Sequence, residues 1–146
     1  MTDFTYNDRV DFSETDAGGI VFFTNFLRWV ARAEGAWFAS LGVMGFERLP
    51  DGTYRGYPRV GVKCDYRAPL FPGDTFAVVL TPVRAGRTSF TYAFRVHRTD
   101  ANGILAAEGS MSIVFAKGTP GGVFDLAPIP ETLVNLARRD KSDSGR

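Results

Sequence analysis

Residues 12–26 read FSETDAGGIVFFTNF, and this stretch joins a strand-like run to a long amphipathic segment. It places two carboxylates, Glu14 and Asp16, and the pair Gly18-Gly19 just before a predicted helix. A carboxylate at this position lies beside backbone N–H groups that a helix leaves unpaired in its first turn. Such donors can bind an anion or stabilise a developing oxyanion. The pattern therefore favours a base or nucleophile at Asp16.

Residues 24–41 have the periodicity of an amphipathic helix. Its apolar face consists of Phe26, Val30, Ala33, Trp37 and Leu41, widened by Leu27, Trp29 and Phe38. The residues that fall largely on the other face are Arg28, Arg32 and Glu34. Thr24 or Asn25 can cap the start of the helix, and Gly42 stands where its end is expected.

The rest of the chain has mostly the period-two pattern of β-strands. The predicted strands are residues 4–12, 60–67, 74–83, 88–99 and 104–116, and residues 42–58 are predicted to be irregular. Short turns between the later strands imply antiparallel neighbours. The order of elements predicts an α+β fold with a curved antiparallel sheet of five to six strands wrapped around one long central helix.

The length of the chain predicts one domain, residues 1–139, with a short helix at residues 128–139. Residues 140–146 are polar and are predicted to form a disordered tail. The second face of the predicted sheet also carries apolar residues, namely Ala77, Val79, Ile104 and Val114. A monomer would expose them, so we expect an oligomer.

Composition excludes several classes of function. A net charge of +1 argues against a nucleic-acid-binding surface. A single cysteine and a single histidine leave no disulfide framework, no multi-thiolate metal site and no histidine cluster, so no metal site is expected. No signal peptide is expected from the first residues, and no apolar run is long enough to span a membrane. We therefore expect a cytoplasmic protein.

Other titratable residues have simpler interpretations. Cys64 lies on the apolar side of its strand and is predicted to be in the core, whereas His97 lies on a polar side and is predicted to be at the surface. Glu14 could be a second carboxylate that tunes Asp16, but the favoured prediction is a solvated or salt-bridged surface acid. For Asp16 itself, the alternative is a loop residue that accepts hydrogen bonds from nearby backbone N–H groups.

Three motifs in this order resemble the hotdog-fold acyl-CoA thioesterases, in particular the 4-hydroxybenzoyl-CoA thioesterase branch. The first is ETDAGGIVFFTNF at residues 14–26. The second is VKCDYRAPLFPGD at residues 62–74, and the third is RAGRTSF at residues 84–90. The resemblance covers roughly residues 5–135.

This resemblance implies an acyl-CoA substrate, no separate cofactor, and a homodimer, usually paired into a homotetramer, with active sites at the dimer interface. It implies that Asp16 is the catalytic carboxylate and that the backbone N–H of Phe23 polarises the thioester carbonyl. Many members carry Tyr, Trp or His where this chain has Phe22-Phe23. A role for a polar side chain is therefore lost here, but a backbone donor remains.

Substrate binding is assigned to residues near these motifs. Gly18 and Gly19 either let substrate approach the backbone or form a plain turn. Phe22 and Phe26 either line an acyl pocket or pack in the core or dimer, and the aromatic residues mildly favour an aryl acyl group. Candidates to bind the CoA phosphates are Lys63, Arg84, Arg87, Thr88 and Ser89. The alternative for these cations is an ordinary charged turn.

Two mechanisms and a second function stay open. Asp16 can attack the thioester and form an anhydride, or it can deprotonate a water molecule. The alternative function is a non-hydrolytic hotdog protein that binds or dehydrates an acyl thioester. Dehydratases of this fold usually rely on a histidine, and the position of His97 disfavours that reading.

Overall fold

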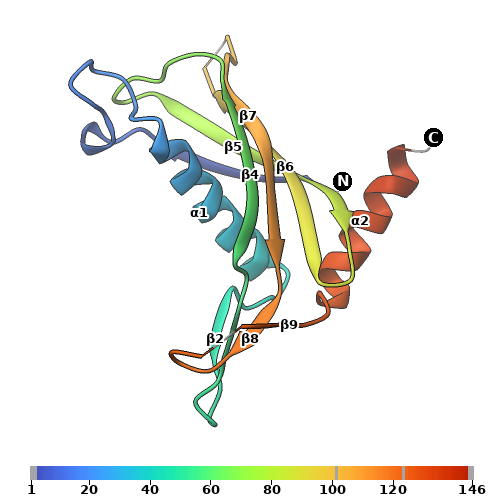
Figure 1. The fold of residues 1–146 in the computed structure, drawn as a ribbon. Coiled ribbons are helices and arrows are strands. Elements are labelled where there is room, and N and C mark those ends of the chain that lie inside the picture. Colours follow the sequence, from blue (N-terminus) through green and yellow to red (C-terminus); the bar gives the residue numbers. More distant parts are fainter. Residues whose placement is uncertain (1–2, 101, 123, 145–146) are drawn as a thin grey trace.

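The computed structural model describes residues 3–100, 102–122 and 124–144 (Figure 1). In chain order its elements are β1 (Phe4–Arg9), the 3-10 helix η1 (Phe12–Glu14), α1 (Thr24–Ser40), β2 (Phe46–Arg48), β3 (Tyr54–Gly56), β4 (Arg59–Tyr66), β5 (Thr75–Ala85), β6 (Ser89–Arg98), β7 (Leu105–Val114), β8 (Ala116–Gly118), β9 (Asp125–Leu126) and α2 (Glu131–Ser144). Within the described residues, no helix is long and apolar enough to cross a membrane.

Five long strands form one antiparallel sheet in the order β1-β5-β6-β7-β4. Helix α1 covers one face of this sheet, where Trp29 stacks on Phe76 with ring centroids 4.1 Å apart. Further along α1, Trp37 meets the edge of the Tyr92 ring on β6. The prediction of an α+β hotdog fold is confirmed, because the sheet, the long helix and their packing are all present.

Helix α1 follows the predicted apolar pattern almost to the residue, but its start and one of its polar residues differ from the prediction. Phe23 occupies the N-cap position without a side-chain cap, so the prediction that Thr24 or Asn25 caps the helix is wrong. Glu34, expected on the exposed face, is buried. It accepts hydrogen bonds from the Tyr92 hydroxyl (2.7 Å) and from Arg59 (2.8 Å), and this pairing permits its burial.

A second, smaller sheet has the order β2-β3-β8-β9 and projects beyond one end of the long sheet (Figure 1). Residues 42–58 therefore contain two strands, β2 and β3, that were not predicted, and the predicted strand 104–116 divides into β7 and β8. The sheet carries a row of aromatic rings, because Tyr54 lies 5.7 Å from Phe46 and 5.6 Å from Phe124 between ring centroids. Phe46 and Phe124 are exposed, at 60% and 47%.

Helix α2 packs against β5 and adds Leu133, Leu136 and Ala137 to the core that also contains α1 and the long sheet. The helix extends to Ser144, past the predicted end at Arg139, and thus includes residues 140–144 of the expected tail. Residues 145–146 of that tail lie outside the described residues.

Candidate active site

Asp16 lies in a closed loop between η1 and α1. The loop is held by a bridge between Thr15 and Val21 and by the bond from the Asp16 N–H to the Ile20 carbonyl, at 2.9 Å. Gly19 adopts a φ of +82°, which a residue with a side chain rarely adopts. The loop thus presents the exposed Asp16 side chain at the end of the molecule where α1 begins.

Only one of the two carboxylate oxygens of Asp16 accepts a hydrogen bond from the described part of the chain. Its Oδ1 atom accepts the Gly18 N–H at 2.8 Å, and a Cβ atom at Gly18 would lie 3.1 Å from that oxygen. No donor among the described residues binds Oδ2. Asp16 therefore does accept a hydrogen bond from the backbone of its own loop, but this bond leaves Oδ2 available for chemistry.

Phe23 supplies a backbone donor at the start of α1. Its N–H has no acceptor within the described part of the chain, whereas the neighbouring Phe22 N–H is bound to the Glu14 carbonyl at 2.9 Å. The Phe23 carbonyl, which belongs to the next peptide group, accepts the Tyr66 hydroxyl at 3.1 Å. An open N–H at a helix N-terminus is suited to an anionic oxygen because the helix dipole adds to the hydrogen bond.

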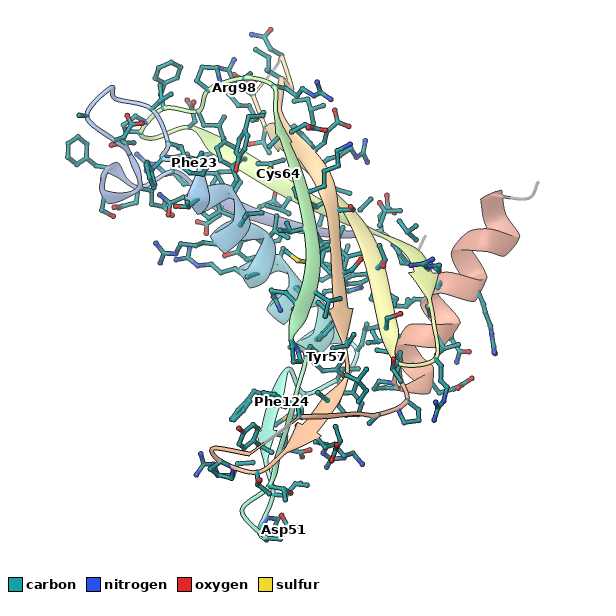
Figure 2. All side chains as sticks on the ribbon, viewed as in Figure 1. Phe23, Asp51, Tyr57, Cys64, Arg98 and Phe124 are labelled. Carbon is teal, nitrogen blue, oxygen red and sulfur yellow. The ribbon has the colours of Figure 1, made fainter. Side chains whose placement is uncertain are left out.

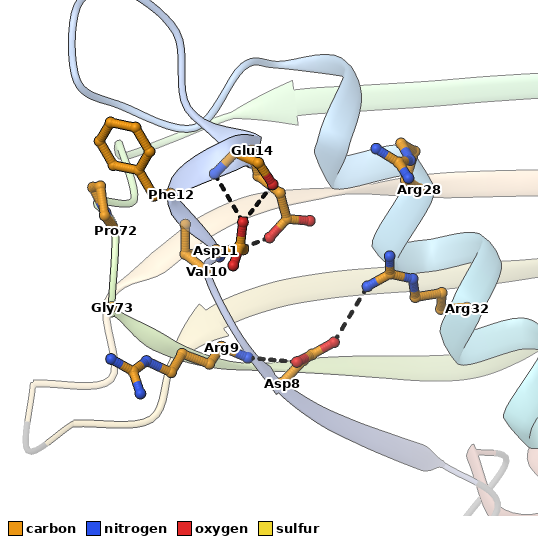
Figure 3. A pocket seen from close by; sticks show the side chains of 11 residues that line it. Asp8, Arg9, Val10, Asp11, Phe12, Glu14, Arg28, Arg32, Pro72 and Gly73 are labelled. Carbon is orange, nitrogen blue, oxygen red and sulfur yellow. Dashed lines mark hydrogen bonds and ion pairs between the residues drawn. The ribbon is translucent and has the colours of Figure 1, made fainter.

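Glu14 is buried, so its assignment to the surface is wrong. Its carboxylate accepts the Trp29 indole N–H at 2.7 Å and the Asp11 N–H at 2.8 Å, and Figure 3 shows it folded back onto Asp11. Its carbonyl accepts a further bond from the Asn25 side chain at 2.8 Å. Glu14 therefore ties the loop that carries Asp16 to the first two turns of α1.

An apolar pocket of about 390 Å³ lies beside the start of α1. It is lined by Ile20, Val21, Phe23, Phe26, Tyr66, Arg67, Ala68 and Pro69. The Tyr66 ring meets Phe23 and Phe26 edge-on, with centroids 6.1 Å and 5.4 Å apart. Phe26 is buried, whereas Phe22 is exposed and does not line this pocket.

Tyr66 was not predicted as a site residue, although its place at the end of an apolar strand could have suggested it. Burial raises the pKa of its hydroxyl to about 12. The hydroxyl thus stays protonated at neutral pH and can donate to the Phe23 carbonyl.

The candidate phosphate-binding residues do not lie beside Asp16 within one subunit. Arg84, Arg87, Thr88 and Ser89 belong to the hairpin that joins β5 to β6. β5 starts near the Asp16 loop, where the Val10 N–H binds the Asp74 carbonyl, and spans about 34 Å to this hairpin at about 3.4 Å per residue. The hairpin is therefore at the opposite end of the sheet. Lys63 is exposed on β4, with its Nζ atom 3.7 Å from Asp65.

Cys64 and His97 do not form a nucleophilic pair. Cys64 lies opposite Gly109, which in turn lies opposite the buried Phe94, so its thiol is on the side of the sheet that faces α1. Burial raises the pKa of this half-buried thiol. His97 follows the buried Val96 on β6 and is therefore on the other side.

A larger hollow of about 800 Å³ lies between β1, η1 and α1 (Figure 3). Arg9, Arg28 and Arg32 line it together with acids, and Arg32 approaches Asp8 at 3.5 Å. Asp11 accepts hydrogen bonds from the backbone and the side chain of Ser13. Opposite charges are balanced in this hollow, so it has no marked preference for an anion.

Comparison with known proteins gives a consistent result. The profile of the Thioesterase-like superfamily matches residues 10–136. A 1,4-dihydroxy-2-naphthoyl-CoA hydrolase of Crocosphaera subtropica is 35% identical over 94 residues, which are 63% of this chain and 66%, just under two thirds, of that protein. A protein of the same name from Prochlorococcus marinus is 31% identical over 113 residues, 71% of each chain.

Solved structures agree in fold. A gentisyl-coenzyme A thioesterase superposes with a TM-score of 0.75 at 27% identity, covering 91% of this chain and 98% of that one. A 1,4-dihydroxy-2-naphthoyl-CoA thioesterase from Synechocystis superposes with a TM-score of 0.77 at 24% identity, covering 93% and 96%.

Proposed function

The chain belongs to the thioesterase-like superfamily and is an acyl-CoA thioesterase, and from this premise we propose that it hydrolyses aryl-CoA thioesters with Asp16 and the backbone N–H of Phe23. The observation that carries the proposal is the pairing of an exposed, half-free carboxylate with an open N–H at the start of α1. The apolar pocket beside them provides a place for the acyl group.

In the proposed reaction, the thioester oxygen accepts the Phe23 N–H, which makes the carbonyl carbon more electrophilic. Asp16 then either takes a proton from a water molecule whose oxygen attacks that carbon, or attacks it directly. In both routes the C–S bond breaks and CoA leaves as the thiolate. Direct attack leaves an acyl anhydride on Asp16, which a water molecule then hydrolyses. One such oxyanion donor contributes about 2.7–4 kcal/mol to lowering the barrier.

The character of the pocket supports an aryl group. Phe23, Phe26 and Tyr66 present aromatic faces and edges, and aromatic pairs gain about 0.5–1.5 kcal/mol beyond the burial of their area. The hydrolases of Crocosphaera and Prochlorococcus are named for a naphthoyl thioester, and the structural relative for a gentisyl thioester. Both names describe aromatic acyl groups.

We propose that the protein is a homodimer that pairs along β4, with a tetramer as the next level of assembly. β4 is an edge strand of the long sheet, and its apolar residues Val60 and Val62 are 61% and 54% exposed. Of the apolar residues predicted on the other face of the sheet, Ala77 is buried within the subunit, Val79 and Val114 are half-buried, and Ile104, which is exposed, precedes β7 rather than lying in the sheet. The phosphate-binding roles of Lys63, Arg84, Arg87, Thr88 and Ser89 remain part of this proposal.

The test is release of CoA thiol from a panel of aryl and aliphatic CoA thioesters. We expect wild type to turn over aryl thioesters and Asp16→Asn to lose about 10²–10⁴-fold in kcat, the usual contribution of a positioned acid or base. Glu131→Gln, an exposed acid on α2, is the matched control and should keep wild-type activity.

Two outcomes would contradict the proposal in different ways. Binding of a thioester without turnover would favour a non-hydrolytic role. Full activity in Asp16→Asn would be compatible with thioesterase activity but would refute the assignment of Asp16 as the catalytic carboxylate. Single-turnover hydrolysis in ¹⁸O-water tests the anhydride route, because label in Asp16 requires that water attack the Asp16 carbon of an anhydride.

A further inference from the structure

The apolar pocket beside α1 is formed from only one side. Its walls come from residues 20–26 and 66–69, and one of them, Tyr66, is the last residue of the edge strand β4. Among the described residues, β4 pairs only with β7, so the backbone groups along its other edge have no partner strand. The exposed side chains of Val62 and Tyr66 lie on the α1-facing side, in the same cross-strand rows as Met111 and Ala107. An open edge with apolar side chains is suited to pair with a second strand.

Two copies of one strand that pair across a two-fold axis must run antiparallel. The opposite charges of Lys63 and Asp65 suit one register of this pairing, and the exposed apolar residues Val62 and Tyr66 suit the same one. When Lys63 faces Asp65 of the partner subunit, the reciprocal pair forms as well, because the axis then passes midway between the two copies of Cys64. The same register sets Val62 opposite Tyr66 of the partner subunit, which joins two exposed apolar residues.

In this antiparallel pairing, the start of β4 in one subunit lies beside the end of β4 in the other. In one subunit, Phe23 lies near one end of β4, and Tyr57 and Phe124 lie near the other (Figure 2). If the same pairing continues beyond Tyr66, the last residue of β4, Pro69 lies opposite Arg59 of the partner subunit. The chain that precedes Arg59 belongs to the second sheet, through β3. The second sheet of one subunit is thereby brought to the open side of the pocket in the other.

We infer that the second sheet of each subunit closes the acyl pocket of its partner, and that the aromatic row of Phe46, Tyr54 and Phe124 determines which acyl groups are hydrolysed. This inference rests on the proposed function. It accounts for aromatic side chains that one subunit leaves exposed, at 60% for Phe46 and 47% for Phe124. A planar aryl group between the Phe23–Tyr66 wall and this row would contact aromatic rings on both sides.

The first experiment measures selectivity as the ratio of kcat/KM for benzoyl-CoA to that for hexanoyl-CoA. We expect Phe46→Ala/Phe124→Ala to lower this ratio about tenfold or more, because loss of apolar contacts in a specificity pocket commonly changes discrimination by about 10–200-fold. Val83→Ala, which shortens an exposed apolar side chain on β5, should leave the ratio unchanged. An unchanged ratio in the double variant, with a wild-type circular dichroism spectrum, would overturn the inference.

The second experiment determines which subunit supplies the wall. Asp16→Asn subunits and Phe46→Ala/Phe124→Ala subunits carry different tags, and mixed dimers are purified through both tags. In such a dimer the only intact Asp16 faces the second sheet of the Asp16→Asn subunit, which is unaltered. We expect wild-type selectivity at about half the wild-type kcat per dimer, since one site of two is active.

A mixed dimer that keeps the selectivity of the double variant would show that the wall acts within one subunit. As a check that does not alter the second sheet, Val62→Glu should give a monomer in sedimentation and reduce benzoyl-CoA hydrolysis at least tenfold. A monomer with full aryl selectivity would also overturn the inference. If wild type hydrolyses no thioester at all, it is the proposed function that fails instead.

Discussion

The two ends of the five-stranded sheet are built in different ways. At the end where α1 begins, buried polar groups fix the backbone, with Glu14 and Asn25 both buried and hydrogen-bonded to neighbouring segments. At the other end, the β5–β6 hairpin and the second sheet present exposed cations and exposed aromatic rings. The difference indicates that the first end holds atoms in place for chemistry, whereas the second presents surface for recognition. Pairing along β4 would bring one end of each kind together in every site.

Glu14→Gln alters the end of the sheet where α1 begins, and we expect it to have a larger effect on stability and kcat than the change in pH considered next. A carboxylate accepts at both oxygens, but an amide presents an NH₂ group to either the Trp29 or the Asp11 donor and leaves it unsatisfied. We expect the free energy of unfolding to fall by about 1–3 kcal/mol, the cost of an unmade buried hydrogen bond. Because the loop that carries Asp16 loosens, kcat should fall about tenfold, a cost that a misplaced group can readily reach.

Chemical denaturation and the pH profile of kcat check this prediction. A purely structural role would lower stability and leave kcat unchanged, and that result would remove Glu14 from the positioning of the site. Glu47→Gln in the second sheet is the matched control, because Glu47 pairs with Arg55 at the recognition end. It should leave kcat unchanged.

A smaller effect is expected at alkaline pH. Burial raises the pKa of Tyr66 at the catalytic end and of Tyr57 near the second sheet, each to about 12. A group whose pKa is higher in the folded protein contributes stability that is complete below the unfolded pKa, near 10, and is lost as the pH rises through the folded value. Stability should therefore decline between pH 10 and 12.

Absorbance of the tyrosinate ion during a pH titration tests this for each residue. Tyr66→Phe and Tyr57→Phe should each remove one late-titrating group. A Tyr66 that titrates near pH 10 would contradict the raised pKa of its hydroxyl, which donates to the Phe23 carbonyl.

The sequence was sufficient to predict the large elements. The 3.6-residue period of α1 and the period-two pattern of the long strands extend over enough residues to be unambiguous, and the apolar surface they bury enforces the same structure. The second sheet was not predicted because β2, β3 and β8 have three residues each and their partners are distant, as in the pair Tyr54 and Gly118.

The errors at the site have a related cause. Periodicity predicts which face a residue occupies, but it does not show whether a polar side chain finds buried partners. Glu14 is buried because Trp29, fifteen positions later, donates to it. Glu34 is buried because Tyr92 and Arg59 do so. Likewise, the composition of the Arg84–Ser89 turn suggested phosphate binding but did not reveal at which end of the sheet the turn lies.

The central claim is that the Phe23 backbone N–H stabilises the oxyanion, and one pair of variants tests it most directly. Phe23→Pro removes this N–H, and the φ of −55° at this position suits proline. Phe23→Ala keeps the N–H and shortens the same side chain. On benzoyl-CoA we expect Phe23→Pro to reduce kcat about 10²–10³-fold below Phe23→Ala, the usual contribution of one oxyanion donor. Equal kcat values for the two folded variants would contradict the claim.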